Sequence, residues 1–353
     1  MATLYITEPE SRIEKEYLRV IVTHEGEVIQ SVPLSTLTEI VIVGTAGATT
    51  QALLTLLDKG IGITFLTRAG KMRGRLVPAN HSNLPLRLRQ YALQTSDAFP
   101  ISIARQIIWG KLYNYRIYCA RMLRNVKKRQ IQDKLRSFLG PNQYPAFQDL
   151  PEAIAGLNRS LQNVPSANDL ETLLGLEGIG SKHYFTVLKA HLNWKQDLGF
   201  FKRQRRPPKD PVNALLSLGY TLLTNSMVSA LTIVGLDPEA GFLHANQRGR
   251  PSLALDLIEE FRPLIVDAIV VRMINQKMIT AESFEEGEQG EMFLTKKGLT
   301  TFFSQYHQRL NVEVLHPFFG KKLSYQKCFE AQAILIKKVI LGEEERYIPM
   351  TWR

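Results

Sequence analysis

The chain has 353 residues, more than a single hydrophobic core usually spans, so two domains are expected. Its hydrophobic share of 44% and charged share of 22% are typical of an ordinary globular protein, but its net charge of +11 is not. This excess indicates a polyanionic partner, nucleic acid rather than a membrane. No signal-peptide core and no unbroken run of about 18 apolar residues is present, so we expect neither a secreted nor a membrane-spanning protein. We therefore expect a cytoplasmic protein with free thiols at Cys119 and Cys328, whose spacing matches no metal or redox motif.

Residues 1–80 predict a β-rich domain. Alternating or continuous apolar runs bounded by turn residues indicate strands, and His24-Glu25-Gly26 between two such runs indicates a hairpin. Strands are predicted at 17–23, 27–32, 39–43 and 61–66, with a short helix at 50–59. No residue type or spacing in this region suggests catalysis, so we expect a dimerisation surface here.

From about residue 80 the sequence changes character. We predict a linker over 81–98 and an α-helical catalytic domain over 99–353, which makes the fold class α+β. Residues 100–138 predict a long helix, because apolar residues that include Cys119 step by three and four along one stripe. Between 101 and 140 the chain has ten Lys or Arg residues and one acid, Asp133, which favours a surface facing phosphates. The basic set includes Lys111, Arg116, Arg121, Arg124, Lys127, Lys128 and Arg129.

The sequence LLGLEGIGSKHYF, residues 173–185, places a charge among apolar and glycine residues. A helix is predicted to begin at Ser166, with Asp169 three residues on as in a capping box, and to end in this stretch. Glu177 is either an ordinary exposed helix end or a functional carboxylate. A helix-hairpin-helix turn, which contacts the DNA backbone through its amides, is the other alternative. Tyr184 and Phe185 speak against it, because that motif needs a small residue there.

The next stretch, 199–209 (GFFKRQRRPPK), predicts a basic loop, since its two prolines exclude a helix interior. Such a loop can close on a phosphate backbone and stack a base on its aromatic residues. Asp210 and Pro211 then start a helix that is apolar nearly throughout and therefore buried. The candidate nucleic-acid-binding residues are Lys202, Arg203, Arg205, Arg206 and Lys209, together with Arg248 and Arg250 further on.

Residues 235–263 (GLDPEAGFLHANQRGRPSLALDLIEEFRP) combine a turn-rich loop that ends near His244 with a helix that starts at Ser252. Asp256 and Glu259 are three residues apart, so they share one face of that helix. An imidazole and two carboxylates in this order predict a metal site that needs one more ligand. The structural alternative is that acidic residues here only stabilise the helix or face solvent. Pro263 is expected to kink the helix.

Four motifs in a fixed order then resemble one family. LLGLEGIGSKHYF, DPVNALLSLGYTLL, GLDPEAGFLH and GRPSLALDLIEEFRP are similar to the motif series of the CRISPR-associated adaptation integrase, a metal-dependent DNA endonuclease. The resemblance covers the whole chain and implies a β-rich N-terminal domain, an all-helical C-terminal domain and a homodimer. It also implies a metal site of Glu177, His244 and Glu259, an acidic neighbour in Asp256, and a small companion adaptation protein.

Two carboxylates and one imidazole form a mostly hard ligand set that suits Mg²⁺ or Mn²⁺, although ligand types alone do not exclude zinc. Such an ion catalyses phosphoryl transfer. Attack by water would cut DNA, whereas attack by a DNA 3′-hydroxyl would join strands. The resemblance favours joining the 3′ ends of captured fragments to the CRISPR repeat. The alternatives are a non-catalytic nucleic-acid scaffold, a helix-hairpin-helix DNA-binding protein, and an unrelated hydrolase of small phosphate substrates.

Overall fold

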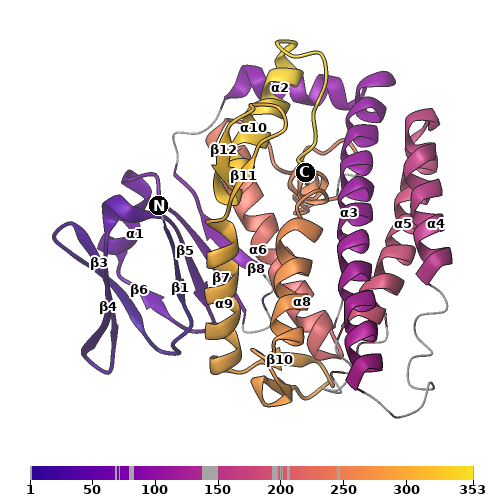
Figure 1. Cartoon of the computed structure of the whole chain (residues 1–353). Coiled ribbons are helices and arrows are strands. Elements are labelled where there is room, and N and C mark those ends of the chain that lie inside the picture. The colour runs from indigo at the N-terminus through magenta and orange to yellow at the C-terminus, as the bar shows by residue number, and fades with distance from the viewer. Residues whose placement is uncertain are drawn as a thin grey trace.

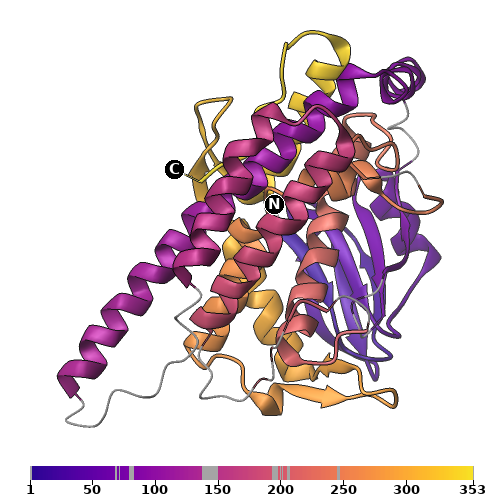
Figure 2. The same ribbon diagram turned by 90° about the vertical axis from the view of Figure 1, so that its right-hand side faces the viewer.

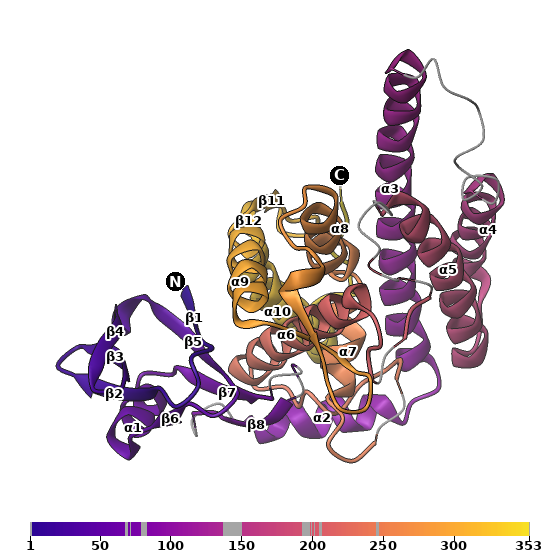
Figure 3. The ribbon, with the colours of Figure 1, turned by 90° about the horizontal axis from the view of Figure 1, so that it is seen from below.

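The computed structural model describes residues 2–67, 70, 72–78, 83–136, 150–192, 198, 200, 202–204, 207–244 and 247–352, with the backbone alone over 125–136. A β-rich N-terminal region lies beside a larger helical region, as the α+β prediction requires (Figure 1). Figure 3 shows the two regions side by side, with helices α3 (Ala98–Arg136), α4 (Leu150–Asn163) and α5 (Leu170–His191) on the side away from the strands of the N-terminal region.

The N-terminal region contains two four-stranded sheets and helix α1 (Thr50–Asp58). The first sheet has the order β1 (Ala2–Ile6), β5 (Leu37–Val43), β7 (Gly62–Leu66), β8 (Met72–Leu76), with β8 antiparallel to the parallel rest. The second has the order β4 (Glu27–Pro33), β3 (Arg19–His24), β2 (Arg12–Glu16), β6 (Gly47–Ala48).

Strand β5 belongs to two hydrophobic cores. Its side chains alternate between the faces of the sheet. Ile40 and Ile42 pack with the second sheet inside the N-terminal region. Val41 and Val43 point the other way and join the core of the helical region. A strand covered on both faces has to be apolar nearly throughout, which explains the sequence EIVIV at 39–43.

The helical region is built around the 39-residue helix α3, which projects beyond its neighbours in Figure 2. The other helices are α2 (Leu84–Gln94), α4 (Leu150–Asn163), α5 (Leu170–His191), α6 (Pro211–Ile233), α7 (Ser252–Ile258), α8 (Ala268–Asn275), α9 (Lys296–Leu310) and α10 (Tyr325–Leu341). Two small hairpins complete it, formed by β9 (Phe284–Glu286) with β10 (Met292–Leu294) and β11 (Glu313–Leu315) with β12 (Lys322–Ser324).

Helix α6 is the central helix of this region. Asp210 caps it by accepting a hydrogen bond from the Asn213 amide at 2.8 Å, and Pro211 occupies its first turn, as predicted. By length and composition alone α6 could cross a membrane, but 78% of its apolar window is buried inside the fold. Its apolar character is therefore explained by packing.

The helix in which a kink was predicted at Pro263 changes its hydrogen-bond pattern at that residue. After α7 the backbone continues into a π-helical turn, η6 (Pro263–Asp267), and then into α8. Proline has no amide hydrogen and cannot complete an α-helical ladder at its position. Within the turn, the carbonyl of Leu264 accepts a hydrogen bond from the Arg309 guanidinium, whose Nε lies 2.8 Å away.

Three local expectations are corrected. The 81–98 segment predicted as a linker contains α2, whose Gln90 donates to the Asp237 and Ala240 carbonyls at 2.9 Å each. Helix α5 is capped by Asp169, not by Ser166, because Asp169 accepts from the Thr172 amide at 2.7 Å. The acidic stretch 281–291, for which the sequence predicts a solvent-facing loop, forms a 3-10 turn (Ala281–Ser283), strand β9 and the turn that leads to β10.

Candidate functional site

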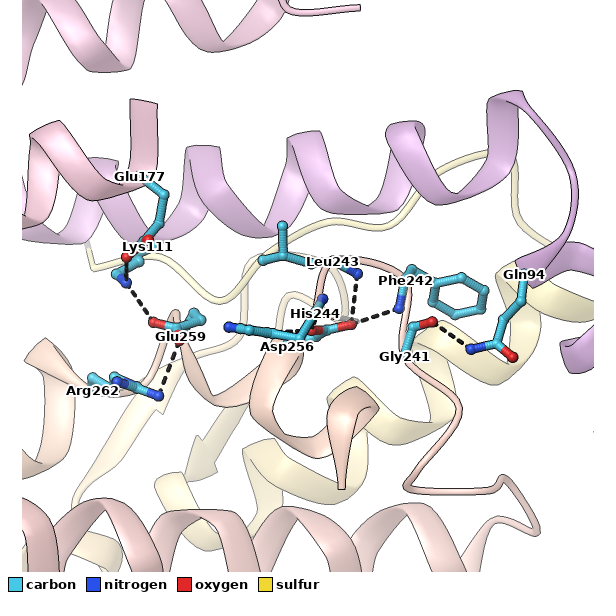
Figure 4. Close-up of polar contacts among 10 residues, drawn as sticks. All are labelled: Gln94, Lys111, Glu177, Gly241, Phe242, Leu243, His244, Asp256, Glu259 and Arg262. Carbon is cyan, nitrogen blue, oxygen red and sulfur yellow. Dashed lines mark hydrogen bonds and ion pairs between the residues drawn. The ribbon is translucent and has the colours of Figure 1, made fainter. Parts of the chain in front are cut away.

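The candidate site lies where α3, α5, α7 and the loop before α7 meet (Figure 4). Glu177 projects from the middle of α5, and Glu259 stands at the C-terminal end of α7. His244 comes from the loop that precedes α7. The three predicted ligands are thus delivered by separate segments to one place between helices.

A lysine that the sequence had placed on a phosphate-facing surface sits between the two glutamates. The ammonium of Lys111, on α3, forms ion pairs with Glu177 and, at 2.6 Å, with Glu259 Oε2. Its side chain is only 2% exposed. Arg262 contacts the other oxygen of Glu259 at 3.0 Å, and Ser181 Oγ donates to Glu177 Oε1 at 2.8 Å. Both carboxylates are therefore held by cations or donors inside the fold.

These cations keep the glutamates ionised. Burial alone would raise the pKa of Glu259, but Arg262, Lys111 and His244 together lower it to about 2. Burial also opposes ionisation of Glu177, yet the charge of Lys111 leaves its pKa below the ordinary value. At neutral pH the site therefore contains two negative charges from two different helices.

Asp256 is committed to shaping the loop that carries His244. Its carboxylate is fully buried and accepts hydrogen bonds from the backbone amides of Phe242, Leu243 and His244 at 2.7, 2.9 and 3.0 Å. It also lies 2.7 Å from His244 Nδ1. A carboxylate accepts this hydrogen bond, so Nδ1 is the donor toward Asp256, and in the neutral imidazole Nε2 then carries the lone pair. In Figure 4 the imidazole points from Asp256 toward Glu259.

A second set of contacts fixes α3 against the residue that follows Glu259. The Asn114 side-chain amide, one turn from Lys111, donates to the Glu260 carbonyl at 2.9 Å and to the Met350 carbonyl at 2.8 Å. The Asn114 oxygen accepts from the Trp352 amide at 2.9 Å. The C-terminal segment thereby ties the helix of Lys111 to the helix of Glu259.

The ligand chemistry of Glu177, His244 and Glu259 fits a hard divalent ion. Two carboxylates already converge on one cation, the Lys111 ammonium, and an imidazole with a free Nε2 points toward them. Within the described ranges, no three His, Cys, Asp or Glu side chains surround a common point closely enough to enclose an ion as they stand. Asp256 points into the loop and is a positioning residue for His244.

The prediction that α5 ends near Glu177 is wrong, because α5 continues without a break to His191. A helix-hairpin-helix turn at 178–180 is therefore excluded. The two glycines there have different surroundings. A Cβ on Gly180 would lie 2.4 Å from a methyl group of Leu112, the neighbour of Lys111, whereas a Cβ on Gly178 would meet no atom within 4 Å. Gly180 lets α5 approach α3 closely enough for Glu177 to reach Lys111.

Gly180→Ala is expected to destabilise the protein by about 1–3 kcal/mol, because overpacking pushes α5 away from α3. Gly178→Ala, two residues away in the same helix, is expected to stabilise it by about 0.4–1 kcal/mol through lower chain entropy when unfolded. Urea denaturation of both variants measures the difference. Equal stabilities would show that α5 and α3 are not in close contact here.

The predicted nucleic-acid-binding residues fall into three groups. Lys202, Lys209 and Arg248 have exposed side chains, and Arg250 is half-buried. Arg203 is held inside the fold, since its guanidinium donates to Asn213 Oδ1 at 2.7 Å. The predictions for Arg205 and Arg206 lie outside the described residues.

Sequence analysis missed the two cations of the site. Lys111 interrupts a buried stripe of α3 that contains Ile107 and Tyr115, and a lone charge among core positions was the available signal. For Arg262 the available signal was its spacing, because it follows Glu259 by three residues and helical side chains at that spacing can pair.

The site can now be set beside known proteins. The family model described as CRISPR associated protein Cas1 matches residues 4–308. A curated protein of Thermus thermophilus named CRISPR-associated endonuclease Cas1 3 is 34% identical, over 100% of this chain and 98% of its own length.

Solved structures share the fold. "Casposase bound to integration product" has a TM-score of 0.81 and 19% identity, covering 100% of this chain and 95% of its own. "Cas6-RT-Cas1--Cas2 complex" has a TM-score of 0.78 and 23% identity, covering 99% of this chain and 36% of its own. These likenesses extend over both the β-rich and the helical regions.

Proposed function

Because the chain belongs to the Cas1 family of CRISPR-associated proteins, we propose that it is the DNA endonuclease and integrase of CRISPR adaptation. Its relatives along the full length are named endonucleases, and its fold is shared with a casposase bound to an integration product. The reaction is phosphodiester cleavage by water or strand joining by a DNA 3′-hydroxyl.

One observation carries the assignment of the site. Two ionised carboxylates from different helices, Glu177 and Glu259, converge on a buried cation beside an oriented imidazole. We infer that Glu177, His244 and Glu259 hold Mg²⁺ or Mn²⁺. A divalent ion bound there would activate the attacking oxygen and neutralise charge on the reacting phosphate.

The chain's own residues prepare this site. Asp256 fixes the proton of His244 on Nδ1, so that Nε2 presents a lone pair toward Glu259. Arg262 holds one oxygen of Glu259 and leaves the other directed at Lys111. These contacts orient two of the three ligands before an ion arrives, which reduces the reorganisation that binding requires.

The partners of the protein are proposed on coarser grounds. We propose that double-stranded fragments and the CRISPR repeat are contacted through exposed basic residues, among them Lys202, Lys209 and Arg248, and through the half-buried Arg250. A small companion protein is suggested by a structural neighbour that is a complex with Cas2.

We propose a homodimer formed through the β-rich region, residues 1–80. Its support is the exposed apolar residues of the second sheet, which are Val28 and Ile29 on the edge strand β4 and Tyr17 and Leu18 in the β2–β3 turn.

The function is tested with a short duplex bearing 3′-hydroxyl ends and a supercoiled plasmid containing the CRISPR repeat. Covalent joining is expected in Mn²⁺ or Mg²⁺ and not in EDTA, because the buried carboxylates need a divalent ion to act on phosphate. A duplex with 3′-deoxy ends should not be joined, although the plasmid should still be nicked. Tight DNA binding with neither joining nor nicking in any divalent ion would instead support the non-catalytic scaffold.

A further inference from the structure

Lys111 is a buried lysine whose ammonium lies between the site's two glutamates. Its neighbours on α3, Ile107, Ile108 and Leu112, are completely buried. Its ammonium touches a carboxylate from α5 on one side and one from α7 on the other. An unpaired ammonium group in the protein interior is unfavourable, because it has lost its hydration. A buried lysine therefore needs charged partners in place of water.

The charges of this cluster balance without a metal ion. Glu177 and Glu259 contribute two negative charges, and Lys111 and Arg262 contribute two positive charges. A divalent ion placed between the glutamates would add two positive charges within a few ångströms of the ammonium. Like charges at that distance repel strongly in a poorly solvated interior.

The two cations differ in their freedom to move. Arg262 lies over the Tyr220 ring, 4.6 Å from its centre, and its planar group is fixed there as well as on Glu259. The contacts described for the Lys111 ammonium are the two glutamates and, at 5.5 Å, the Tyr115 ring. A lysine side chain is also long and flexible. Lys111 is therefore the cation that an incoming ion displaces.

We propose that Lys111 is a resident counter-ion that occupies the divalent-ion position while the ion is absent and competes with the ion for Glu177 and Glu259. This inference rests on the metal site of the proposed function. It follows that Lys111 weakens the affinity for a divalent ion. It also follows that a DNA phosphate, by restoring the charge balance, strengthens that affinity.

The test is a titration of the full-length protein with Mn²⁺, with free Mn²⁺ measured by electron paramagnetic resonance. Lys111→Met keeps most of the length of the side chain and removes the charge. It is expected to tighten Mn²⁺ binding by about tenfold or more, a change of 1.4 kcal/mol for each factor of ten. Lys111→Gln also removes the charge, but its amide can still donate a hydrogen bond to a glutamate. It therefore guards against a folding defect in Lys111→Met, and tighter Mn²⁺ binding is again expected.

Two controls complete the test. Lys111→Arg keeps the charge and should not tighten binding. Arg116→Met removes a cation five residues away on the same helix, where Arg116 lies over the Tyr113 ring, and should leave the Mn²⁺ affinity unchanged. Adding a short DNA duplex should tighten Mn²⁺ binding by wild-type protein more than by Lys111→Met.

The outcomes separate the two proposals. If Glu259→Gln abolishes Mn²⁺ binding while Lys111→Met and Lys111→Gln bind Mn²⁺ no more tightly than wild type, the role of Lys111 is overturned and the metal site stands. If wild type and Glu259→Gln bind Mn²⁺ equally, the proposed metal site itself is wrong.

Discussion

Glu177→Gln, His244→Ala and Glu259→Gln are each expected to lower Mn²⁺-dependent DNA cleavage and joining by more than about a hundredfold. Losing a residue that only orients a metal ligand costs about 10–100-fold, and losing a ligand itself should cost more. The three residues come from separate segments, namely α5, a loop and α7. Because they are proposed to share one ion, substituting any of them should lower activity to a similar extent. Glutamine is chosen because it fills the same volume beside Lys111. The measurement is the initial rate of plasmid nicking and of oligonucleotide joining.

The control for these variants is Glu171→Ala, which removes an exposed carboxylate from the first turn of α5. It should retain wild-type rates. DNA affinity should persist in all three site variants, since the exposed basic residues lie elsewhere on the surface. Near wild-type cleavage by Glu177→Gln beside an inactive His244→Ala would remove Glu177 from the ligand set.

Asp256→Ala is expected to cost both activity and stability, in contrast to variants of solvent-facing carboxylates. Three backbone amides of the 242–244 loop would lose their acceptor inside the fold. Each buried unsatisfied group costs about 1–3 kcal/mol, so the loss of unfolding free energy should reach about 3 kcal/mol or more. Urea denaturation followed by circular dichroism measures it.

Asp256→Asn separates the two effects. Its remaining oxygen can still accept from the loop amides, but its amide nitrogen cannot, so an intermediate stability is expected. Cleavage should fall by about 10–100-fold even where the variant folds, because the His244 ring is no longer held with its proton on Nδ1. Asp256→Ala with wild-type stability would mean that the loop does not depend on this carboxylate.

Most helices and several strands were predictable because their signals are local. The sequence predicts helices over 296–310 and 325–340, which match α9 and α10 closely. Asp210 with Pro211 marks the start of α6. Strand β5 was recognisable from its continuous apolar run. Strand β1 was missed because it depends on pairing with β5, a partner distant in sequence. Strand β8 was also missed, although it pairs with the neighbouring strand β7.

The candidate site was predictable only in part. The four motifs identified Glu177, His244, Asp256 and Glu259, but spacing in the sequence placed Asp256 beside Glu259 as a possible ligand. The structure turns Asp256 toward the loop, because three backbone amides there need an acceptor. Lys111 could not be assigned from sequence, since its partners lie 66 and 148 residues away.

The strand shared by two cores has a consequence for how the protein unfolds. Because alternate side chains of β5 complete different cores, losing either core removes half of the support of this strand. Heating or denaturant should therefore melt the β-rich and helical regions in one cooperative transition, with coincident near- and far-ultraviolet signals. A substitution at Ile40, inside the sandwich, would then lower the melting temperature of the distant helices as well, because the two halves of the molecule share one stability.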